Sequence, residues 1–372
     1  MNPPAETAQR IARLAPLREV VAQVEALARP VAPRDAVLEE ALGCVLATDV
    51  TALESRPAQP VAILDGWAVR AELVQDAGAY SPIALSPPPA WVEVGDRLPP
   101  DADALLPPDA VTVRGNNFEA IAGAVPGTGV LAAGGNVERG ALLRRAGERL
   151  RASDIAVLAA LGVAIVHARR PNIRITVMNP RLGHGIAATL LKHAVEAAGG
   201  TVAVDDGASL ERALLDEGAD AVFVIGGTGQ GKRDASVTAL ARVGRVAIHG
   251  FGIAPGETGA IGQAGGRPML LFPGRLDAAL ALWLLVGSKL VARLAGSTEQ
   301  AMTVEARLSR KIASQVGIAE VVPVRRGEDG LEPLASAVLG LATLVRADGW
   351  VLVPPESEGF PAGAMVEMRA LP

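Results

Sequence analysis

The sequence predicts a multidomain α/β protein: a helical segment with a small inserted β-domain, a doubly wound α/β domain and a C-terminal β-barrel-like domain. Three observations support this. The chain has 372 residues, which exceeds one ordinary hydrophobic core and predicts about two to four domains. Strands and helices alternate from residue 172 onward, as they do in parallel-sheet domains. On either side of that region, short apolar runs are separated by proline and glycine, which is typical of small β-domains.

The N-terminal segment carries the first helical pattern. Apolar residues recur at helical spacing over residues 15–29, and Pro30 ends the pattern. A second helix is expected at about 34–42. A third is expected over Ser153–Leu161, with Ser153 as its N-cap.

The stretch between the second and third helices reads differently. Proline clusters such as Pro87–Pro89 divide it into short β-like runs, so we predict a β-domain inserted into a helical one. The predicted domains are residues 1–50 plus 140–170 (helical/linker), 51–139 (inserted β), 171–297 (α/β) and 298–372 (C-terminal β).

The α/β domain follows from a regular rhythm. The expected strands cover residues 173–177, 201–204 and 221–225, with helices at about 186–198, 210–216 and from 235. Continuously apolar strands indicate a parallel sheet covered on both faces, with its ligand site at the carboxyl ends of the strands. After Gly296 no further helix is expected, and strands are predicted at 304–308, 319–324 and 349–353.

Composition excludes several classes of protein. Lysine plus arginine number 35 and aspartate plus glutamate 40, a net charge of −5 without a basic block, so nucleic acid is not an expected partner. The single cysteine, Cys44, forms neither an internal disulfide nor a cysteine metal cage. The uninterrupted apolar runs are shorter than the roughly 18 residues of a membrane span, and no export signal is present. We therefore expect a cytoplasmic protein with no membrane partner.

The strongest local signal is a glycine-rich turn. The apolar strand Ala221–Ile225 runs into Gly226-Gly227-Thr228-Gly229-Gln230-Gly231, and a helical pattern follows from Ala235. Backbone N–H groups and the helix dipole at such a junction favour an anion. The spacing matches neither a Walker A loop nor GxGxxG. On spacing alone, a phosphate cradle and a merely tight turn both remain open.

Other candidates have a structural alternative. Asp234 lies near the start of a helix, where a carboxylate serves as an N-cap or takes part in catalysis. Asp65 occupies a turn before a strand, and His184 either contacts an anion or is exposed to solvent. The pairs Pro255-Gly256 and Pro273-Gly274 mark turns at strand ends.

In their order along the chain, these segments resemble the molybdopterin molybdotransferase family, of the MoeA and gephyrin E-domain type, over nearly the whole length. The matching segments are Ile63–Arg70 (similar to MDGYAVR), Gly95–Ala104 (G-x-x-LP-x-GADA), Gly134–Gly140 (GED-x-x-x-G), Gly226–Asp234 (the glycine loop of the MogA-like molybdopterin-binding domain), Pro255-Gly256 (KPGKP), Pro273-Gly274 (LPGNP) and, in the C-terminal β-domain, Ala347–Trp350 with Pro361–Gly363.

The resemblance implies a homodimer that binds adenylylated molybdopterin and catalyses Mg²⁺-assisted insertion of molybdate into its dithiolene. It implies that Asp65 and Asp234 are catalytic residues and ligands of Mg²⁺. The residues it implies for cofactor binding are Gly226, Gly227, Thr228, Gly229, Gly231, Pro255, Gly256, Pro273, Gly274 and Arg275.

The chain is a divergent member of this pattern. Gly134-Gly135-Asn136 replaces the acidic GED, Ala254 and Glu257 replace the lysines of KPGKP, and residues 178–181 replace a TGDE-like turn. One hypothesis is a molybdotransferase with a degenerate active site. The alternative is a non-catalytic pterin-binding carrier or scaffold that serves a molybdoenzyme or a cofactor-biosynthesis partner. A third reading, an unrelated nucleotide-binding α/β enzyme, conflicts with the order of the motifs.

Overall fold

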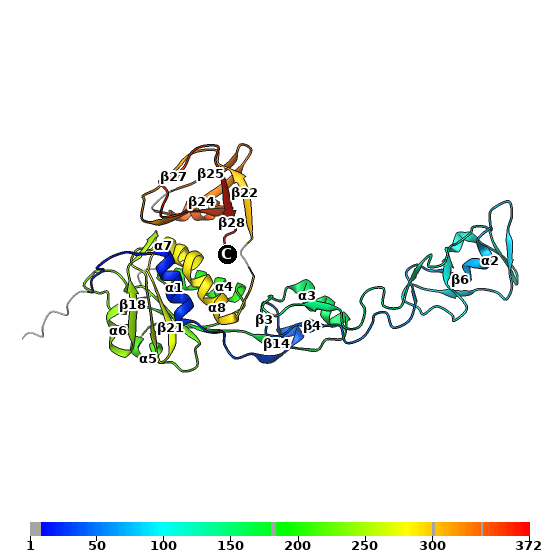
Figure 1. Ribbon diagram of the computed structural model, residues 1–372, viewed down its shortest axis with the longest axis horizontal. Coiled ribbons are helices and arrows are strands. Elements are labelled where there is room, and N and C mark those ends of the chain that lie inside the picture. Colours follow the sequence, from blue (N-terminus) through cyan, green and yellow to red (C-terminus); the bar gives the residue numbers. More distant parts are fainter. Residues whose placement is uncertain (1–8, 180–183, 208, 300–301, 336–337) are drawn as a thin grey trace, which may run out of the picture. The chain divides into compact units, whose positions relative to one another are not determined.

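The computed structural model describes residues 9–179, 184–207, 209–299, 302–335 and 338–372. The chain forms two compact units (Figure 1). The first consists of Met1–Thr48, Ala146–Ala156 and Ala164–Pro372, and the second of Asp49–Arg145 and Val157–Val163. The predicted insertion, residues 51–139, lies inside the second unit. The mixed α/β, multidomain fold class is confirmed.

A six-stranded sheet forms the centre of the first unit, in the order β16-β15-β17-β21-β20-β18. Its strands are β15 (Asn172–Val177), β16 (Thr201–Asp205), β17 (Ala221–Ile225), β18 (Arg245–His249), β20 (Ala260–Ala264) and β21 (Arg267–Phe272). The first four in this order are parallel, as expected. Strand β20 runs antiparallel to both of its neighbours, β21 and β18, which corrects the prediction of an all-parallel sheet. A turn at Gly265 and Gly266, both with positive φ, joins β20 to β21 as a hairpin.

Helices cover both faces of this sheet (Figure 1). One face carries α1 (Leu17–Leu27), α4 (His184–Ala197), α7 (Leu276–Leu282) and α8 (Ser288–Ala295), and the other carries α5 (Leu210–Leu214) and α6 (Ser236–Val243). Strand β17 is buried throughout because it is covered on both sides: Phe223 faces the first layer and Val222 the second. The helices predicted in this region are confirmed.

One helical run is apolar enough to resemble a membrane span. Leu276–Ala295 comprises α7, a π-helical turn at Trp283–Gly287 and α8. By length and composition alone, this run could cross a membrane. This run was not expected from the sequence, because polar residues interrupt its apolar stretch. Its most apolar window is 72% buried inside the fold, so packing against the sheet accounts for its composition.

The segments before and after the insertion depart most from expectation. Helix α1 is confirmed, but the helix predicted at 34–42 is wrong: strand β2 (Arg34–Val37) and a 3₁₀ turn at Leu38–Glu40 occupy it. Pairing of β2 with β14 (Ile165–Arg169) satisfies the backbone there. Strand β3 (Val45–Leu46) also pairs with β14.

The predicted cap of the third helix is also wrong. Helix α3 is Ala152–Ala160, so Ser153 lies within it. The Asp154 carboxylate instead accepts the Arg151 N–H at 2.9 Å, which satisfies a backbone donor at the start of the helix.

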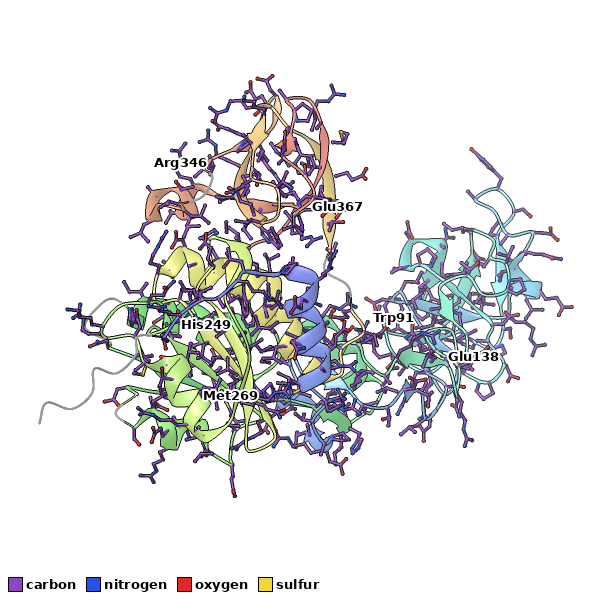
Figure 2. The ribbon with its side chains drawn as sticks, turned by 60° about the vertical axis from the view of Figure 1, so that its left-hand side comes forward. Trp91, Glu138, His249, Met269, Arg346 and Glu367 are labelled. Carbon is purple, nitrogen blue, oxygen red and sulfur yellow. The ribbon has the colours of Figure 1, made fainter. Side chains whose placement is uncertain are left out.

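The second unit is mainly β, as predicted. Its strands are β4 (Val50–Thr51), β5 (Val61–Ala62), β6 (Gly66–Val69), β7 (Ile83–Leu85), β8 (Ala90–Val92), β9 (Ala104–Leu106), β10 (Val111–Arg114), β11 (Asn117–Ala120), β12 (Val130–Leu131) and β13 (Leu142–Arg144). The short helix α2 (Ala71–Val74) and a 3₁₀ turn at Pro108–Ala110 accompany them. The Trp67 ring packs edge-on against Trp91, which Figure 2 labels, at 5.0 Å between centroids.

The C-terminal part of the first unit contains the three predicted strands. They are β22 (Thr303–Arg307), β24 (Ala319–Gly327) and β26 (Gly349–Val353). Strands β25 (Gly330–Pro333) and β28 (Met365–Arg369) belong to the same sheet. Strands β23 (Ile312–Ala313) and β27 (Gly359–Phe360) form a separate two-stranded sheet. Helix α9 (Leu341–Arg346) corrects the expectation that helices stop at Gly296. None of its residues is buried, and its six residues are too few for a helical period to stand out in the sequence.

The N-terminal and C-terminal regions meet in one sheet. Strand β1 (Ala15–Pro16) pairs in parallel with β19 (Phe251–Ala254), and β19 pairs in parallel with β24. Strand β19 is therefore held by a neighbouring strand on each side, and this positions the start of the loop that follows it.

Candidate functional site

A pocket of about 610 Å³ is formed where β15, β17 and β21 end. These strands are parallel neighbours, so their following loops meet at one edge, as expected for an α/β domain. The lining residues are Met178, Asn179, His184, Gly227, Thr228, Gly229, Gly231, Lys232, Arg233, Asp234, Thr258, Pro273, Gly274 and Arg275.

Most of the predicted site residues of the α/β domain line this pocket. Gly226, Pro255 and Gly256 are exceptions. Gly226 donates its N–H to the carbonyl of Phe272 at 2.9 Å, and Pro255 and Gly256 are buried in the loop after β19. Ligand binding by any of these residues remains a prediction.

The glycine loop has a backbone that requires glycine at its first two positions. Gly226 and Gly227 have φ of +89° and +70°, a region that side chains disfavour. A Cβ at Gly227 would lie 2.5 Å from Ser236 Oγ. That hydroxyl donates to the Gly226 carbonyl at 2.7 Å, and the Ser236 N–H donates to the Gly227 carbonyl at 3.0 Å. The first residue of α6 thus ties down the start of the loop.

Asp234 closes the other end of the loop. Its Oδ2 accepts the Gly231 N–H at 2.8 Å. The N-cap of α6 is Ala235, so the interpretation of Asp234 as helix cap is wrong: the carboxylate turns back onto the loop. A Cβ at Gly229 or Gly231 would lie 2.7 or 2.9 Å from Oδ2, so the carboxylate occupies the space that these glycines leave. Among the described residues, Oδ1 of Asp234 has no hydrogen-bond partner.

His184 lies between two of the glycine-containing loops. A Cβ at Gly226 or at Gly274 would overlap its imidazole ring. Its Nδ1 bonds to the Met178 carbonyl, which can only accept, so Nδ1 carries the hydrogen. In the neutral ring, Nε2 is therefore an acceptor. The expectation of a solvent-exposed histidine is corrected, since the residue is half-buried and lines the pocket.

Thr228 links the glycine loop to the loop after β19. Its buried hydroxyl lies 3.0 Å from the Thr258 hydroxyl, and its carbonyl accepts Nε2–H of His249, which Figure 2 labels. Glu257 does not line the pocket, and its carboxylate accepts the Gly256 N–H at 3.0 Å. The loop therefore contributes Thr258, which sequence reasoning missed because the Pro-Gly turn was its only visible signal.

The pocket carries more positive than negative charge. Lys232, Arg233 and Arg275 line it, and Asp234 is the one acidic residue among the lining residues. Lys232 and Arg233 are exposed to solvent. Such an excess of cations beside a glycine loop suits an anionic ligand.

Asp65 belongs to the second unit. It is exposed in the turn before β6, as predicted, and its Oδ1 accepts the Val94 N–H at 2.8 Å. The following Gly66 is required because a Cβ there would overlap the carbonyl of Leu106. Throughout the described part of the chain, no group of three or more His, Cys, Asp or Glu side chains is arranged to hold a metal ion. Ligation of Mg²⁺ by Asp65 and Asp234 remains a prediction.

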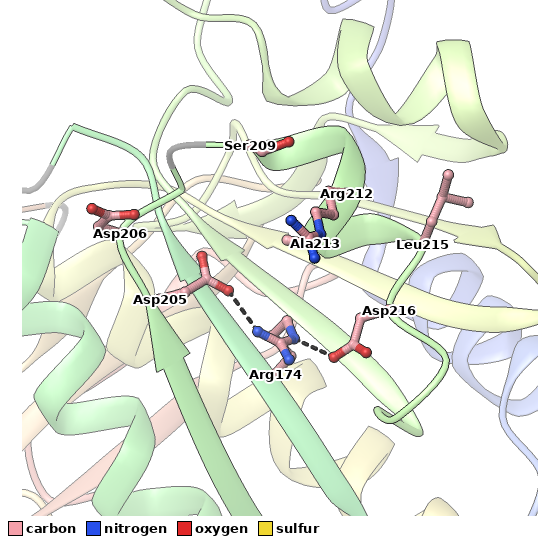
Figure 3. Close-up of a pocket in the computed structure, with 8 residues that line it drawn as sticks. All are labelled: Arg174, Asp205, Asp206, Ser209, Arg212, Ala213, Leu215 and Asp216. Carbon is pink, nitrogen blue, oxygen red and sulfur yellow. Dashed lines mark hydrogen bonds and ion pairs between the residues drawn. The ribbon is translucent and has the colours of Figure 1, made fainter.

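A second pocket, of about 690 Å³, lies between β15, β16 and α5 (Figure 3). Arg174 lies between two carboxylates there: it donates to Asp205 at 3.1 Å and pairs with Asp216. The Gly218 N–H, together with Arg174, holds the pKa of Asp216 below its usual value. No local sequence signal marked these residues, and the charge of Arg174 is paired with Asp205 and Asp216 within the fold.

Comparisons with known proteins match this chain to proteins of molybdopterin biosynthesis along most of its length. The family described as "MoeA N-terminal region (domain I and II)" matches residues 15–162, and that described as "Probable molybdopterin binding domain" matches residues 181–293. Molybdopterin molybdenumtransferase 1 of Mycobacterium tuberculosis is 26% identical over 95% of this chain and 98% of its own length. A putative molybdopterin biosynthesis protein of Methanocaldococcus jannaschii is 24% identical over 89% and 90%.

Solved structures show the same fold. A crystal structure of the molybdopterin biosynthesis moeA protein from Pyrococcus horikoshii superposes with a TM-score of 0.76 and 23% identity, covering 96% of this chain and all of that one. Another structure, also described as a molybdopterin biosynthesis moeA protein from Pyrococcus horikoshii, gives a TM-score of 0.72 and 26% identity and covers 97% of this chain and all of that one.

Proposed function

The chain belongs to the MoeA-type family of molybdenum cofactor biosynthesis, and from this premise we propose that it inserts molybdate into adenylylated molybdopterin held at the glycine-loop pocket. The observation that carries the proposal is the pocket itself: a glycine loop at the carboxyl end of β17, surrounded by Lys232, Arg233 and Arg275.

The loop has backbone donors to offer to a phosphate. Among the described residues, the N–H groups of Thr228, Gly229 and Gln230 donate to no protein acceptor. Several N–H groups on successive residues form an anion-binding concavity, and the lining cations add attraction for phosphate and molybdate. The pyrophosphate of the adenylylated pterin would lie here. The imidazole of His184 lines the same pocket, and its Nε2 would accept a hydrogen bond from the ligand.

Mg²⁺ suits the donor chemistry of this pocket. Magnesium sites commonly use one or two carboxylates and complete their coordination with water and substrate phosphate. Asp234 supplies one carboxylate, whose Oδ1 has no partner among the described residues. The resemblance of the Ile63–Arg70 segment to the family motif implies Asp65 as a second carboxylate ligand, and this stays a prediction. When bound, the ion would neutralise charge on phosphate and molybdate oxygens.

The alternative function is a pterin-binding carrier or scaffold without transferase activity. The observation that favours it is the small number of acids at the pocket, because binding needs backbone donors and cations, whereas metal-assisted transfer needs carboxylates. Under either function, the proposal includes a cytoplasmic homodimer that delivers the pterin to a molybdoenzyme.

The test separates the two functions. Purified protein is incubated with adenylylated molybdopterin, molybdate and graded Mg²⁺, and transfer is measured as molybdate-dependent activity of an added apo-molybdoenzyme. The proposal expects measurable activity that depends on Mg²⁺. Tight binding of the pterin without metal insertion at any Mg²⁺ concentration would establish the carrier instead.

A further inference from the structure

Gln9 is a buried polar residue that reaches the glycine loop from the far end of the sequence. The residue is 8% exposed, and it lies more than 200 positions before the residues that it contacts. Nε2 donates to the carbonyls of Gly227 at 2.8 Å and Gly229 at 2.7 Å. Oε1 accepts the N–H groups of Val237 at 3.2 Å and Thr238 at 3.4 Å.

These four bonds use the full capacity of a carboxamide, which offers two N–H donors and two oxygen lone pairs. Val237 and Thr238 are the second and third residues of α6, whose N–H groups have no partner inside a helix. Helix α6 has no capping bond from its own N-cap residue, Ala235. Gln9 therefore caps α6 from outside, and it also holds two carbonyls of the loop.

Holding those carbonyls fixes the direction of the neighbouring N–H groups. A peptide unit is planar and trans, so its N–H points opposite to its C=O. The Gly227 carbonyl shares a peptide unit with the Thr228 N–H, and the Gly229 carbonyl shares one with the Gln230 N–H. Because both carbonyls point at Gln9, both N–H groups point away from it. Gln9 itself does not line the pocket.

We propose that Gln9 is a positioning residue for the ligand: it orients the Thr228 and Gln230 N–H groups so that the glycine loop binds the phosphate of the substrate. The inference rests on the proposed function for the identity of the ligand. Gln9 already accepts two of the N–H groups at the start of α6, so these two groups are not available to an anion. The inference therefore adds that Gln9, as well as the end of α6, determines the affinity for the anion.

The test compares four full-length proteins: wild type, Gln9→Ala, Gln9→Glu and the control Gln315→Ala, in which an exposed glutamine of the same unit is removed. The probe is molybdopterin released anaerobically from a molybdoenzyme, with affinity measured by ultrafiltration. Amide hydrogen exchange over residues 226–234 provides a second readout that needs no ligand. Thermal unfolding checks that each variant is folded.

Gln9→Ala should weaken molybdopterin binding by about tenfold and speed exchange of the loop amides. The Gly229 carbonyl loses the Gln9 bond, which releases the Gln230 N–H, whereas the Gly227 carbonyl keeps the bond from the Ser236 N–H at 3.0 Å. Gln315→Ala should match the wild type in both. Gln9→Glu adds a pH signature: an ionised carboxylate has no hydrogen to donate, whereas the protonated acid has one. The ratio of wild-type to Gln9→Glu affinity should therefore rise between about pH 4.5 and pH 7.5.

Equal affinity of wild type and Gln9→Ala overturns the inference while leaving the proposed function intact. So does a Gln9→Glu ratio that is independent of pH, the result expected if Gln9 only fills space. If the wild type itself does not bind molybdopterin, the proposed function fails. Hydrogen exchange then decides the inference alone, and unchanged loop protection in Gln9→Ala overturns it.

Discussion

The guanidinium of Arg275 donates two hydrogen bonds to the carboxylate of Asp277, from Nε to Oδ1 at 3.1 Å and from Nη2 to Oδ2 at 2.5 Å. Arg275 lines the glycine-loop pocket, whereas Asp277 is 5% exposed and also accepts the Leu339 N–H at 3.2 Å. One buried carboxylate thus connects a cation of the pocket to the C-terminal region of the chain.

This relationship predicts that substitutions of Arg275 and Asp277 have non-additive effects on stability. Arg275→Ala leaves Asp277 buried without its cation and should lower the free energy of unfolding by about 1–3 kcal/mol in urea denaturation. Adding Asp277→Asn to Arg275→Ala should recover part of the loss, because the asparagine is neutral. Arg13→Ala, which breaks an exposed pair with Glu19, is the control and should cost less. Additive effects of the two substitutions would contradict the coupling.

Asp234→Asn tests the catalytic carboxylate. The amide oxygen can still accept the Gly231 N–H, so the loop should keep its shape while the charge for Mg²⁺ is lost. We expect molybdate-dependent reconstitution to fall by at least about tenfold with little change in melting temperature. An unfolded Asp234→Asn protein would show that the carboxylate is required for the fold, and its catalytic assignment would be withdrawn.

Gly229→Val tests the space inside the loop. Its Cβ would lie 2.7 Å from Asp234 Oδ2, so the carboxylate must move and the branched side chain must enter the pocket. Pterin binding should be abolished with the fold largely retained, as measured by ultrafiltration and circular dichroism. Gly78→Val is the matched control, since a Cβ there meets nothing within 4 Å. Unchanged affinity in Gly229→Val would exclude the loop as the phosphate site.

Asp216 predicts how stability depends on pH. Its pKa is lowered in the folded state by the Gly218 N–H and by Arg174, so its stabilising contribution is present above the unfolded pKa of about 4 and is lost as pH falls through the lower folded value. Asp216→Asn should therefore reduce the free energy of unfolding at about pH 7, and the difference from wild type should shrink toward about pH 3. Glu217→Gln, which removes a neighbouring exposed carboxylate, is the matched control.

The family resemblance predicts a homodimer. Light scattering at micromolar concentration should give twice the chain mass of 38.0 kDa. A mass equal to a single chain would rule the dimer out under those conditions.

Sequence alone determined the features that depend on neighbouring residues and on motif order. The buried strand Ala221–Ile225 and its glycine turn were both found, because continuous apolarity followed by glycine is a local signal. The family was recognised in the same way, since its motifs follow one another along the chain. The helix predicted at residues 34–42 was wrong, because pairing of β2 with β14 stabilises a strand there despite the helical pattern of the sequence.

Only the tertiary structure decided what surrounds the glycine loop. Gln9, His184 and Thr258 come from three other segments, and no spacing rule relates them to Gly226–Gly231. Asp234 illustrates the difference within one motif: its position beside a helix predicted a cap, but its side chain bonds back to Gly231. The reason is physical. A buried polar group takes whichever partner the folded chain brings within about 3 Å, and that partner is set by the packing of the sheet and its loops.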